Sequence, residues 1–143
     1  MRALLMLSGP NLNMLGRRDP AQYGTTTLGE LELQVRAWAA ERGFALRAFQ
    51  SNHEGALIDA LQEARDWAEG ALVNPGALTH YSYALHDAIV DFGKPVVEVH
   101  LSKISEREEW RRVSVIRSAC RSHVEGQGAA GYRAALDLLV ALL

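Results

Sequence analysis

Residues 3–24 read ALLMLSGPNLNMLGRRDPAQYG, an apolar run, Ala3–Leu7, followed by a polar segment bounded by glycines. The apolar run is too short to span a membrane and has the length and composition of a buried strand. The segment after it, Gly9–Gly24, is long for a connection between a strand and a helix. Connections of this length in compact domains usually form lids or binding loops, or are disordered. The stretch therefore predicts a first strand that leads into a functional loop.

The rest of the chain alternates short apolar runs with segments of helical periodicity. The expected strands are Ala3–Leu7, Phe44–Phe49, Ala71–Val73, Val96–Val99 and His123–Glu125. The residues expected on the apolar helix faces are Leu28, Leu31, Val35, Trp38 and Ala39, then Leu57, Leu61, Ala64 and Ala68, then Leu85, Ala88, Ile89 and Phe92, and last Tyr132, Ala135, Leu136, Leu139, Val140 and Leu143. Thr27 and Glu30 have the spacing of a capping box, and Gly43 and Gly93 are expected to end the first and third helices.

Five strands with intervening helices predict a single α/β domain over residues 1–143, with a parallel sheet between two layers of helices. The simplest arrangement of this kind is the flavodoxin-like, doubly wound, five-stranded sheet in three layers. Ligands of such sheets bind outside the carboxyl ends of the strands, where loops and helix N-termini gather. The residues that follow each strand are therefore the candidates for a functional site.

The charge and the cysteine count exclude some classes of partner and site. The chain has 15 basic and 17 acidic residues and a formal net charge of -2, so it has no broad attraction for nucleic acid or an anionic membrane. Cys120 is the only cysteine, which excludes an intrachain disulfide and a cysteine-rich zinc site. A reducing, cytoplasmic location is the resulting expectation.

Amides, histidines and hydroxyls follow the expected strands. They are Asn11 and Asn13, then Asn52, His53 and Glu54, then Asn74 and His80, and then His100 and Ser102. Any one of them, taken alone, is more simply interpreted as a turn or cap residue. We retain that interpretation for Ser51, Asn52 and His53, with Asn52 as a candidate cap of the second helix.

Glu98 and His100 stand two residues apart on one expected strand, so their side chains point to the same face. A carboxylate beside an imidazole can orient the ring and favour its protonated form, which suits a general acid at neutral pH. The alternative is a charged pair at the end of a strand. The pattern alone favours neither interpretation.

The long loop also brings Arg17, Arg18 and Tyr23 together. A phenol is too weakly ionised at pH 7 to act as a base unaided. Nearby guanidinium groups would stabilise the phenolate, and closure of the loop would strengthen the effect by excluding water. Tyr23 is thus a candidate base. Alternatively, its ring packs at the entrance of the first helix while both arginines stay solvated.

The segment Ser105–Ser114, SEREEWRRVS, holds a second arginine pair, Arg111 and Arg112. Ser105 and Glu108 have the spacing of a capping box and predict a short helix here. The arginines could bind hydroxyls or a carboxylate of a ligand, or they could form solvated pairs with the neighbouring glutamates.

Five ordered blocks carry a resemblance to a known family. They are GPNLNMLGRRDPAQYG, FQSNHEG, NPGALTHYSYALHDA, EVHLSKISEREEWR and GQGAAGY. Together they resemble the type II 3-dehydroquinate dehydratases along nearly the whole chain. The resemblance implies reversible dehydration of 3-dehydroquinate to 3-dehydroshikimate through an enolate, the third step of the shikimate pathway. It implies no metal and no organic cofactor.

The resemblance also implies roles for the residues that match the family's motifs. Tyr23 would take the proton beside the ketone, with Arg18 holding the loop and stabilising the charge of the enolate. Arg112 would help to ionise Tyr23. His100, oriented by Glu98, would protonate the departing hydroxyl.

Further roles concern water, substrate and assembly. Asn11 would position a water at the enolate oxygen. The residues implied to bind substrate are Asn74, His80 and Arg111, the backbone amides of Leu101 and Ser102 with the Ser102 hydroxyl, and Asp87 of an adjacent subunit. The family assembles as trimers grouped into a dodecamer, so a homododecamer is expected. Asp87 and Tyr83 lie off the apolar face of the third helix, which suits a contact with solvent or a neighbouring subunit.

Two lysines bear on the mechanism. The unrelated class of this enzyme works through a lysine Schiff base, and this chain has only Lys94 and Lys103. Lys94 is expected at the opposite end of the fourth strand, away from the site edge. Lys103 and Ser105 stand where the family usually has asparagine and histidine, which bears on carboxylate binding or subunit contacts.

Three other functions fit the sequence less well. A flavin-binding flavodoxin needs a short Ser/Thr-Gly phosphate loop after the first strand, and GPNLNMLGRRDP is not one. A phosphoacceptor receiver domain needs an aspartate at the end of the third strand, where this chain has Asn74. A metal hydrolase is disfavoured because no pair among the five histidines has HxxxH spacing.

Overall fold

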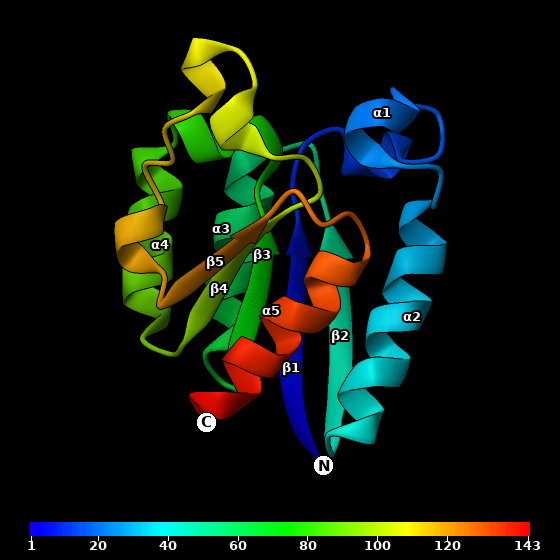
Figure 1. Ribbon diagram of the computed structural model, residues 1–143. Coiled ribbons are helices and arrows are strands. Elements are labelled where there is room, and N and C mark those ends of the chain that lie inside the picture. The colour runs from blue at the N-terminus through cyan, green and yellow to red at the C-terminus, as the bar shows by residue number, and fades with distance from the viewer.

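The computed structural model describes residues 1–143. Its centre is a five-stranded parallel sheet in the order β2-β1-β3-β4-β5 (Figure 1). The strands are β1 (Arg2–Ser8), β2 (Phe44–Gln50), β3 (Ala68–Asn74), β4 (Val96–His100) and β5 (Ser122–Glu125). This order confirms the predicted flavodoxin-like, doubly wound arrangement. Each expected strand is present; β3 is four residues longer than predicted, and the other strands are one or two residues longer.

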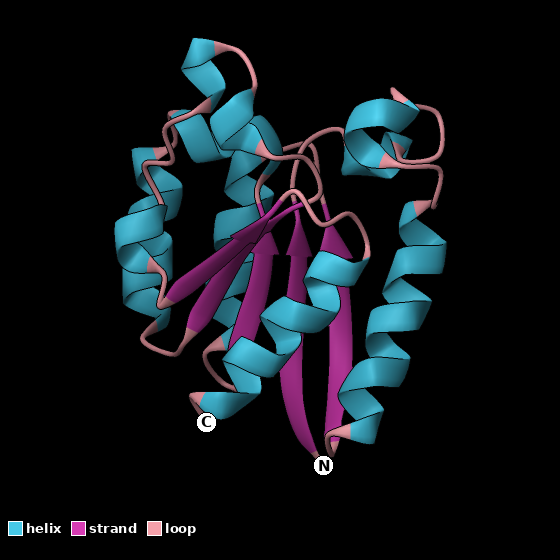
Figure 2. Ribbon diagram, viewed as in Figure 1, coloured by secondary structure: helices cyan, strands magenta, loops and turns pink.

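Helices cover both faces of the sheet, as Figure 2 shows. The α-helices are α1 (Pro20–Tyr23), α2 (Leu28–Glu41), α3 (Glu54–Ala64), α4 (Tyr83–Phe92) and α5 (Ala130–Ala141). The short 3-10 turns are η1 (Leu12–Met14), η2 (Gly76–His80), η3 (Ile104–Glu106), η4 (Glu109–Arg111) and η5 (Arg117–Ala119). None of the helices combines the length and the apolar character needed to cross a membrane.

The sheet separates two hydrophobic cores, and β1 contributes to both. Leu4 and Met6 lie in the core beneath α2 and α5, whereas Leu5 and Leu7 lie in the core beneath α3 and α4. Successive side chains of a strand point to opposite faces, so a strand covered on both sides must be apolar throughout. This requirement explains the unbroken apolar run at the start of the chain.

The ends of the helices follow local signals in the sequence. Thr27 Oγ1 accepts a hydrogen bond from the Glu30 backbone N–H at 3.2 Å and donates one to the Glu30 carboxylate at 3.0 Å, which confirms the predicted capping box. Gly43 and Gly93 have φ values of 84° and 71°, a left-handed conformation that glycine adopts without a steric penalty. Both glycines end their helices as predicted.

Two helix ends differ from the prediction. Ala68 belongs to β3 and not to the second predicted helix, because α3 ends at Ala64 and a tight turn precedes the strand. The burial of Ala68 is that of a strand residue in the core, so its helical spacing from Ala64 is a coincidence. Leu143 lies beyond the end of α5 and is partly exposed.

The helix predicted from Ser105 and Glu108 is absent. The segment instead forms the two 3-10 turns η3 and η4, and neither turn has a side-chain cap. The Ser105 hydroxyl donates to the Glu125 carboxylate, and Glu108 accepts from Arg111 Nε at 2.6 Å. Both members of the predicted capping box therefore have other partners.

Candidate active site

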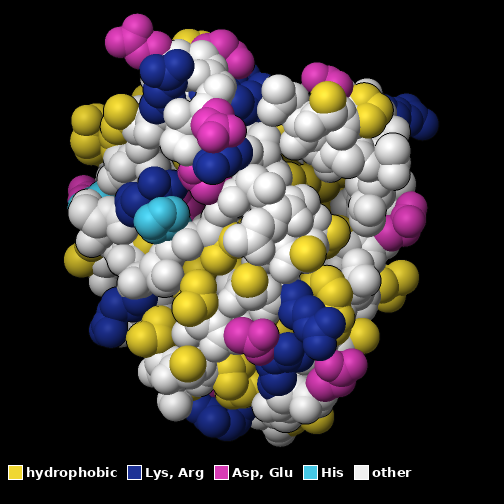
Figure 3. Space-filling view, viewed as in Figure 1, with side chains coloured by type: hydrophobic (Ala, Val, Ile, Leu, Met, Phe, Trp, Pro, Cys, Tyr) yellow, Lys and Arg dark blue, Asp and Glu magenta, His cyan; other side chains and the backbone are white.

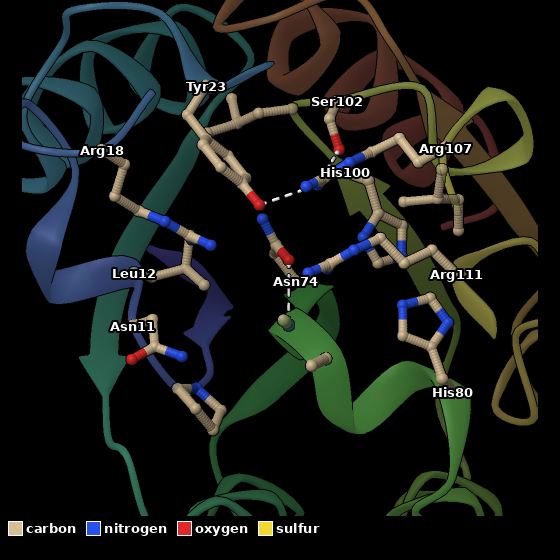
Figure 4. Close-up of a pocket in the computed structure, with 15 residues that line it drawn as sticks. Asn11, Leu12, Arg18, Tyr23, Asn74, His80, His100, Ser102, Arg107 and Arg111 are labelled. Atoms are coloured by element: carbon tan, nitrogen blue, oxygen red, sulfur yellow. Dashed lines mark hydrogen bonds between the residues drawn. The ribbon is translucent and has the colours of Figure 1, made fainter. Parts of the chain in front are cut away.

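A cavity lies at the carboxyl edge of the sheet, beneath the segment that carries α1 (Figure 4). Its walls come from the loop after β1, from η2, and from the end of β4 with the segment that follows. The lining residues are Pro10, Asn11, Leu12, Arg18, Tyr23, Asn74, Gly76, Ala77, His80, His100, Leu101, Ser102, Ile104, Arg107 and Arg111. The edge predicted from the topology is thus where the polar side chains meet.

Two loops cross at the floor of this cavity without room for a side chain. A Cβ atom at Gly9 would lie 2.4 Å from the Pro75 carbonyl oxygen, and one at Gly76 would lie 2.8 Å from the Pro10 carbonyl oxygen. The Gly9 N–H donates to the Asn74 carbonyl at 2.8 Å, which fixes the crossing. The two glycines allow the ends of β1 and β3 to bring their loops into backbone contact.

Asn11 enters the cavity wall from a left-handed turn with φ 70°. Its backbone N–H donates to Asn52 Oδ1 at 2.9 Å, and the Gln50 side chain donates to the same oxygen at 3.2 Å. Asn52 therefore ties the loop after β1 to the end of β2. It does not cap the second predicted helix, whose N-cap is His53 with no side-chain hydrogen bond.

Tyr23 lies between two arginines. Arg107 Nη1 donates to Tyr23 Oη at 2.7 Å, and the Arg18 guanidinium carbon lies 3.6 Å from the centre of the Tyr23 ring. Burial lowers the pKa of Arg18, and the positive charges of Arg107 and Arg111 lower it further, against an opposing effect of Tyr23. Two guanidinium groups, those of Arg18 and Arg107, are therefore concentrated around the phenol.

The arginine that contacts the Tyr23 phenol is Arg107, whereas the family resemblance implied Arg112 for this role. Arg112 is exposed, does not line the cavity, and donates through Nε to the Arg107 carbonyl at 3.1 Å. Sequence analysis missed Arg107 because glutamates flank it on both sides, which is typical of a solvated arginine. Arg107 and Arg111 are four residues apart, which could have indicated that they work together. This spacing places two side chains on one face only if the segment is helical.

Glu98 and His100 form a buried pair on β4. His100 Nε2 lies 2.5 Å from Glu98 Oε2, and the Glu98 side chain is 0% exposed. Burial raises the pKa of the Glu98 carboxyl, but hydrogen bonds from His100 and Thr79 and the charges of His100 and Arg117 outweigh it and lower the pKa to about 2. Since the ionised carboxylate only accepts, Nε2 carries the proton of this contact and Nδ1 is the nitrogen left for the cavity.

Three further polar side chains line the cavity. His80 Nδ1 donates to the Val113 carbonyl at 2.7 Å, which leaves Nε2 as an acceptor, and burial lowers the pKa of this imidazole. Arg111 lies over the Trp110 ring at 4.0 Å, and the same ring meets His80 edge-on. Asn74 Oδ1 accepts from the Gly76 N–H at 3.1 Å, so its amide nitrogen remains a donor.

Leu101 and Ser102 also line the cavity, and Ser102 Oγ accepts from Arg107 at 3.2 Å. Asp87 does not reach it. Its side chain is 81% exposed on α4, beside His86.

The two lysines lie outside the cavity. Lys94 donates to backbone carbonyls of Arg65 and Ala68 at the opposite end of β4, as predicted. Lys103 pairs with Glu106 at 3.2 Å and is exposed. No group of three or more His, Cys, Asp or Glu side chains is arranged to hold a metal ion.

One known protein family matches nearly the whole chain. The profile described as "Dehydroquinase class II" matches residues 2–140. A "3-dehydroquinate dehydratase" of Bacillus pumilus is 50% identical over 140 residues, which are 98% of this chain and 95% of that protein. A protein of the same name from Deinococcus radiodurans is 50% identical over 141 residues, which are 98% of this chain and 99% of that protein.

Solved structures agree with the sequence comparison. The type II dehydroquinase from Butyrivibrio crossotus has a TM-score of 0.94 at 41% identity and covers 96% of this chain and 97% of its own. The type II dehydroquinase from Propionibacterium acnes also has a TM-score of 0.94, at 36% identity, and covers 99% of this chain and 97% of its own. The similarity thus extends over the complete cavity.

Proposed function

The chain belongs to the class II dehydroquinase family, and we propose that it catalyses the reversible dehydration of 3-dehydroquinate to 3-dehydroshikimate in the shikimate pathway. The observation that carries this proposal is the juxtaposition of a phenol, bound by a guanidinium at 2.7 Å, and an imidazole, bound by a buried carboxylate at 2.5 Å, in one cavity. An elimination of water needs such a base and such an acid on one substrate.

Tyr23 is the proposed base of the first step. As a phenolate it removes the proton beside the ketone, and the electron pair of the broken C–H bond moves into the enolate. The hydrogen bond from Arg107 and the stacked Arg18 support this role, because both favour negative charge at the phenol. Arg18 and a water held by Asn11 stabilise the enolate oxygen in this scheme.

His100 is the proposed acid of the second step. Nδ1 gives its proton to the departing hydroxyl, the C–O bond breaks, and the enolate collapses to the enone with loss of water. Glu98 orients the ring by accepting a hydrogen bond from Nε2. The two steps together transfer no electrons to or from the protein.

The remaining polar residues are proposed to bind the substrate. The hydroxyls are bound by Asn74, His80 and Arg111, whose free donors and acceptors line the cavity. The carboxylate is bound by the backbone amides of Leu101 and Ser102 and by the Ser102 hydroxyl. Arg107 donates to Ser102 Oγ, so the hydroxyl proton is available for that carboxylate.

The activity assay tests the proposal. Purified protein mixed with 3-dehydroquinate, without added metal or cofactor, should produce the ultraviolet absorbance of the conjugated enone. Tyr23→Phe should lose at least about 100-fold of this rate, the lower range for a general base, with an unchanged circular dichroism spectrum. Full activity of Tyr23→Phe would remove the proposed base.

A trapping experiment separates this mechanism from Schiff-base catalysis. Borohydride reduces an imine formed between a lysine and the substrate, so covalent labelling of Lys94 or Lys103 in the presence of substrate would contradict the enolate mechanism. No incorporation is expected, because Lys94 lies at the far end of β4 and Lys103 pairs with Glu106 outside the cavity.

The assembly and the location are also proposals. A homododecamer of four trimers would bring Asp87 of a neighbouring subunit to the site, and the exposed Asp87 and Tyr83 side chains on α4 support such a contact. Light scattering tests it, since an active monomer would remove the role of Asp87. The proposed compartment is the cytoplasm, in line with the single cysteine.

A further inference from the structure

The Glu98 carboxylate has more partners than the orientation of one imidazole requires. Besides His100, Oε2 accepts from Thr79 Oγ1 at 2.6 Å and from Ser114 Oγ at 2.9 Å. Oε1 accepts from Ser114 Oγ at 3.0 Å and from Arg117 Nε at 3.3 Å. Four groups from four separate segments therefore converge on one carboxylate that is fully buried.

The proposed reaction leaves the Glu98 carboxylate without a charged imidazole beside it during part of each turnover. His100 gives up its proton during each turnover, and Glu98 then has no positive charge from the imidazole. A buried carboxylate without a cation is strongly disfavoured and tends to take up a proton. The proton that it would take most easily is the one on His100 Nε2, and such a transfer would release the ring from its orientation.

Arg117 is the only permanent cation in contact with Glu98. The other ionisable groups around the carboxylate are His100 on β4, His80 on η2, Cys120 after η5, and Glu125 and His123 on β5. Burial and the charge of Glu98 raise the pKa of the Cys120 thiol to about 12, so it is neutral. Glu125 cannot supply a positive charge, and the His80 ring hydrogen-bonds to the Val113 carbonyl rather than to Glu98. A guanidinium stays charged at any pH at which the enzyme works.

Arg117 lies between two carboxylates, those of Glu98 and Glu125, and Glu98 is the closer one. Its Nη2 atom is 3.8 Å from Glu125 Oε2, and both of these atoms are buried without a hydrogen-bond partner. The Ser105 hydroxyl donates to the other oxygen of Glu125. The arginine thus makes its hydrogen bond to Glu98 while Glu125 adds a weaker attraction.

We propose that Arg117 is a positioning residue of the reaction, which keeps Glu98 ionised while His100 is neutral. Thr79 and Ser114 fix the orientation of the carboxylate through their hydroxyls. The proton of His100 is then exchanged with the substrate and not with Glu98. This inference rests on the proposed function, because it needs His100 to change its protonation state.

Arg117→Met tests the charge, and Arg117→Lys restores it. In Arg117→Met we expect kcat to fall about 10- to 100-fold with KM changed less than about 3-fold, since Arg117 does not line the cavity. The acidic limb of the pH profile of kcat should move to higher pH, because Glu98 takes up a proton more easily. Arg117→Lys should recover most of the rate. Arg121→Met, an exposed arginine four residues away, is the matched control.

A measurement without substrate separates this inference from the proposed function. In protein with 13C-labelled glutamate carboxyls, Glu98 should titrate at a clearly higher pH in Arg117→Met than in the unmodified protein. That shift supports the role of Arg117 even if 3-dehydroquinate is not converted.

Two results would overturn it: an unchanged Glu98 titration in Arg117→Met, or equal loss of kcat in the Met and Lys variants, which would indicate a purely structural role. If Arg117→Met does not fold, Ser114→Ala removes a donor to both oxygens and should shift the titration in the same direction by a smaller amount.

Discussion

Replacing Arg107 by methionine should slow catalysis mainly by removing the charged hydrogen bond that stabilises negative charge on Tyr23. Arg107 Nη1 lies 2.7 Å from the phenol oxygen, and its side chain is only 12% exposed, so water screens the interaction little. A hydrogen bond from a charged donor typically contributes about 1.5–3 kcal/mol. Since the phenolate is the proposed base, kcat/KM at pH 7 should fall about 10- to 150-fold.

The dependence on pH distinguishes this cause from a loss of packing. In Arg107→Met the deficit in kcat/KM should become smaller as the pH rises, because a base that has lost a stabilising charge can still form at high pH. Arg112→Met should keep its rate within about 3-fold, because Arg112 is exposed and its side chain hydrogen-bonds to the Arg107 carbonyl outside the cavity. Steady-state assays from pH 5 to 10, with Arg121→Met as control, measure both effects. A loss that is constant across this range, or a larger loss in Arg112→Met, would refute the reasoning.

Three further predictions concern the acid, the core and the buried carboxylate. His100→Ala should lower kcat about 10²- to 10⁴-fold at an unchanged circular dichroism spectrum, the range typical of a general acid; a rate near that of the unmodified protein would contradict the role. Phe92→Ala should destabilise the protein by about 3–5 kcal/mol in urea titrations, because Phe92 is 2% exposed in the core beneath α4, whereas Val90→Ala on the exposed face of the same helix should cost less than about 1 kcal/mol. The pKa of Glu98 is lowered from its ordinary value of 4.5 to about 2 in the folded protein, so its stabilisation, about 3 kcal/mol, is present above pH 4.5 and is lost as the pH falls toward 2. Glu98→Gln should flatten this part of the stability profile, and an identical acid dependence in both proteins would contradict the assignment.

The helices and strands could be predicted because their signals are local. Leu85, Ala88, Ile89 and Phe92 recur at the spacing of one helix face, and all four are buried in α4. Gly93 ends that helix through a property of its own backbone. Burial on one face and the conformation of one glycine need no knowledge of distant residues, so the sequence alone carries them.

The site could be predicted in part, and for a different reason. Parallel strands carry the residues after them to one edge, so Asn74, His80, His100 and Ser102 meet there whatever the details of the loops. Arg107 could not be found in this way. It reaches Tyr23 from a segment of 3-10 turns that has no periodicity, and the path of that segment depends on contacts such as the one between Ser105 and Glu125.

The partners of Glu98 could not be predicted either, because they come from segments whose paths depend on tertiary contacts. Thr79 and Ser114 are 19 and 16 residues from Glu98 in the chain, and neither belongs to a pattern that points toward a carboxylate. The failed capping box of Ser105 and Glu108 is the complementary case, in which a clear local pattern lost to tertiary partners. Short segments with few local contacts are decided by the residues around them.

The crossing of the two loops at the cavity floor has a consequence for laboratory evolution of new substrates. Gly9 and Gly76 each face a backbone carbonyl of the other loop at a distance that no Cβ atom can occupy. Backbone cannot move aside as a flexible side chain can, so randomised libraries that include either codon would consist mostly of misfolded clones. Diversity is better placed at Ala77, which lines the same cavity and is only partly buried, so its side chain can vary in size. The floor then serves as a fixed reference against which the shape of the walls can be changed.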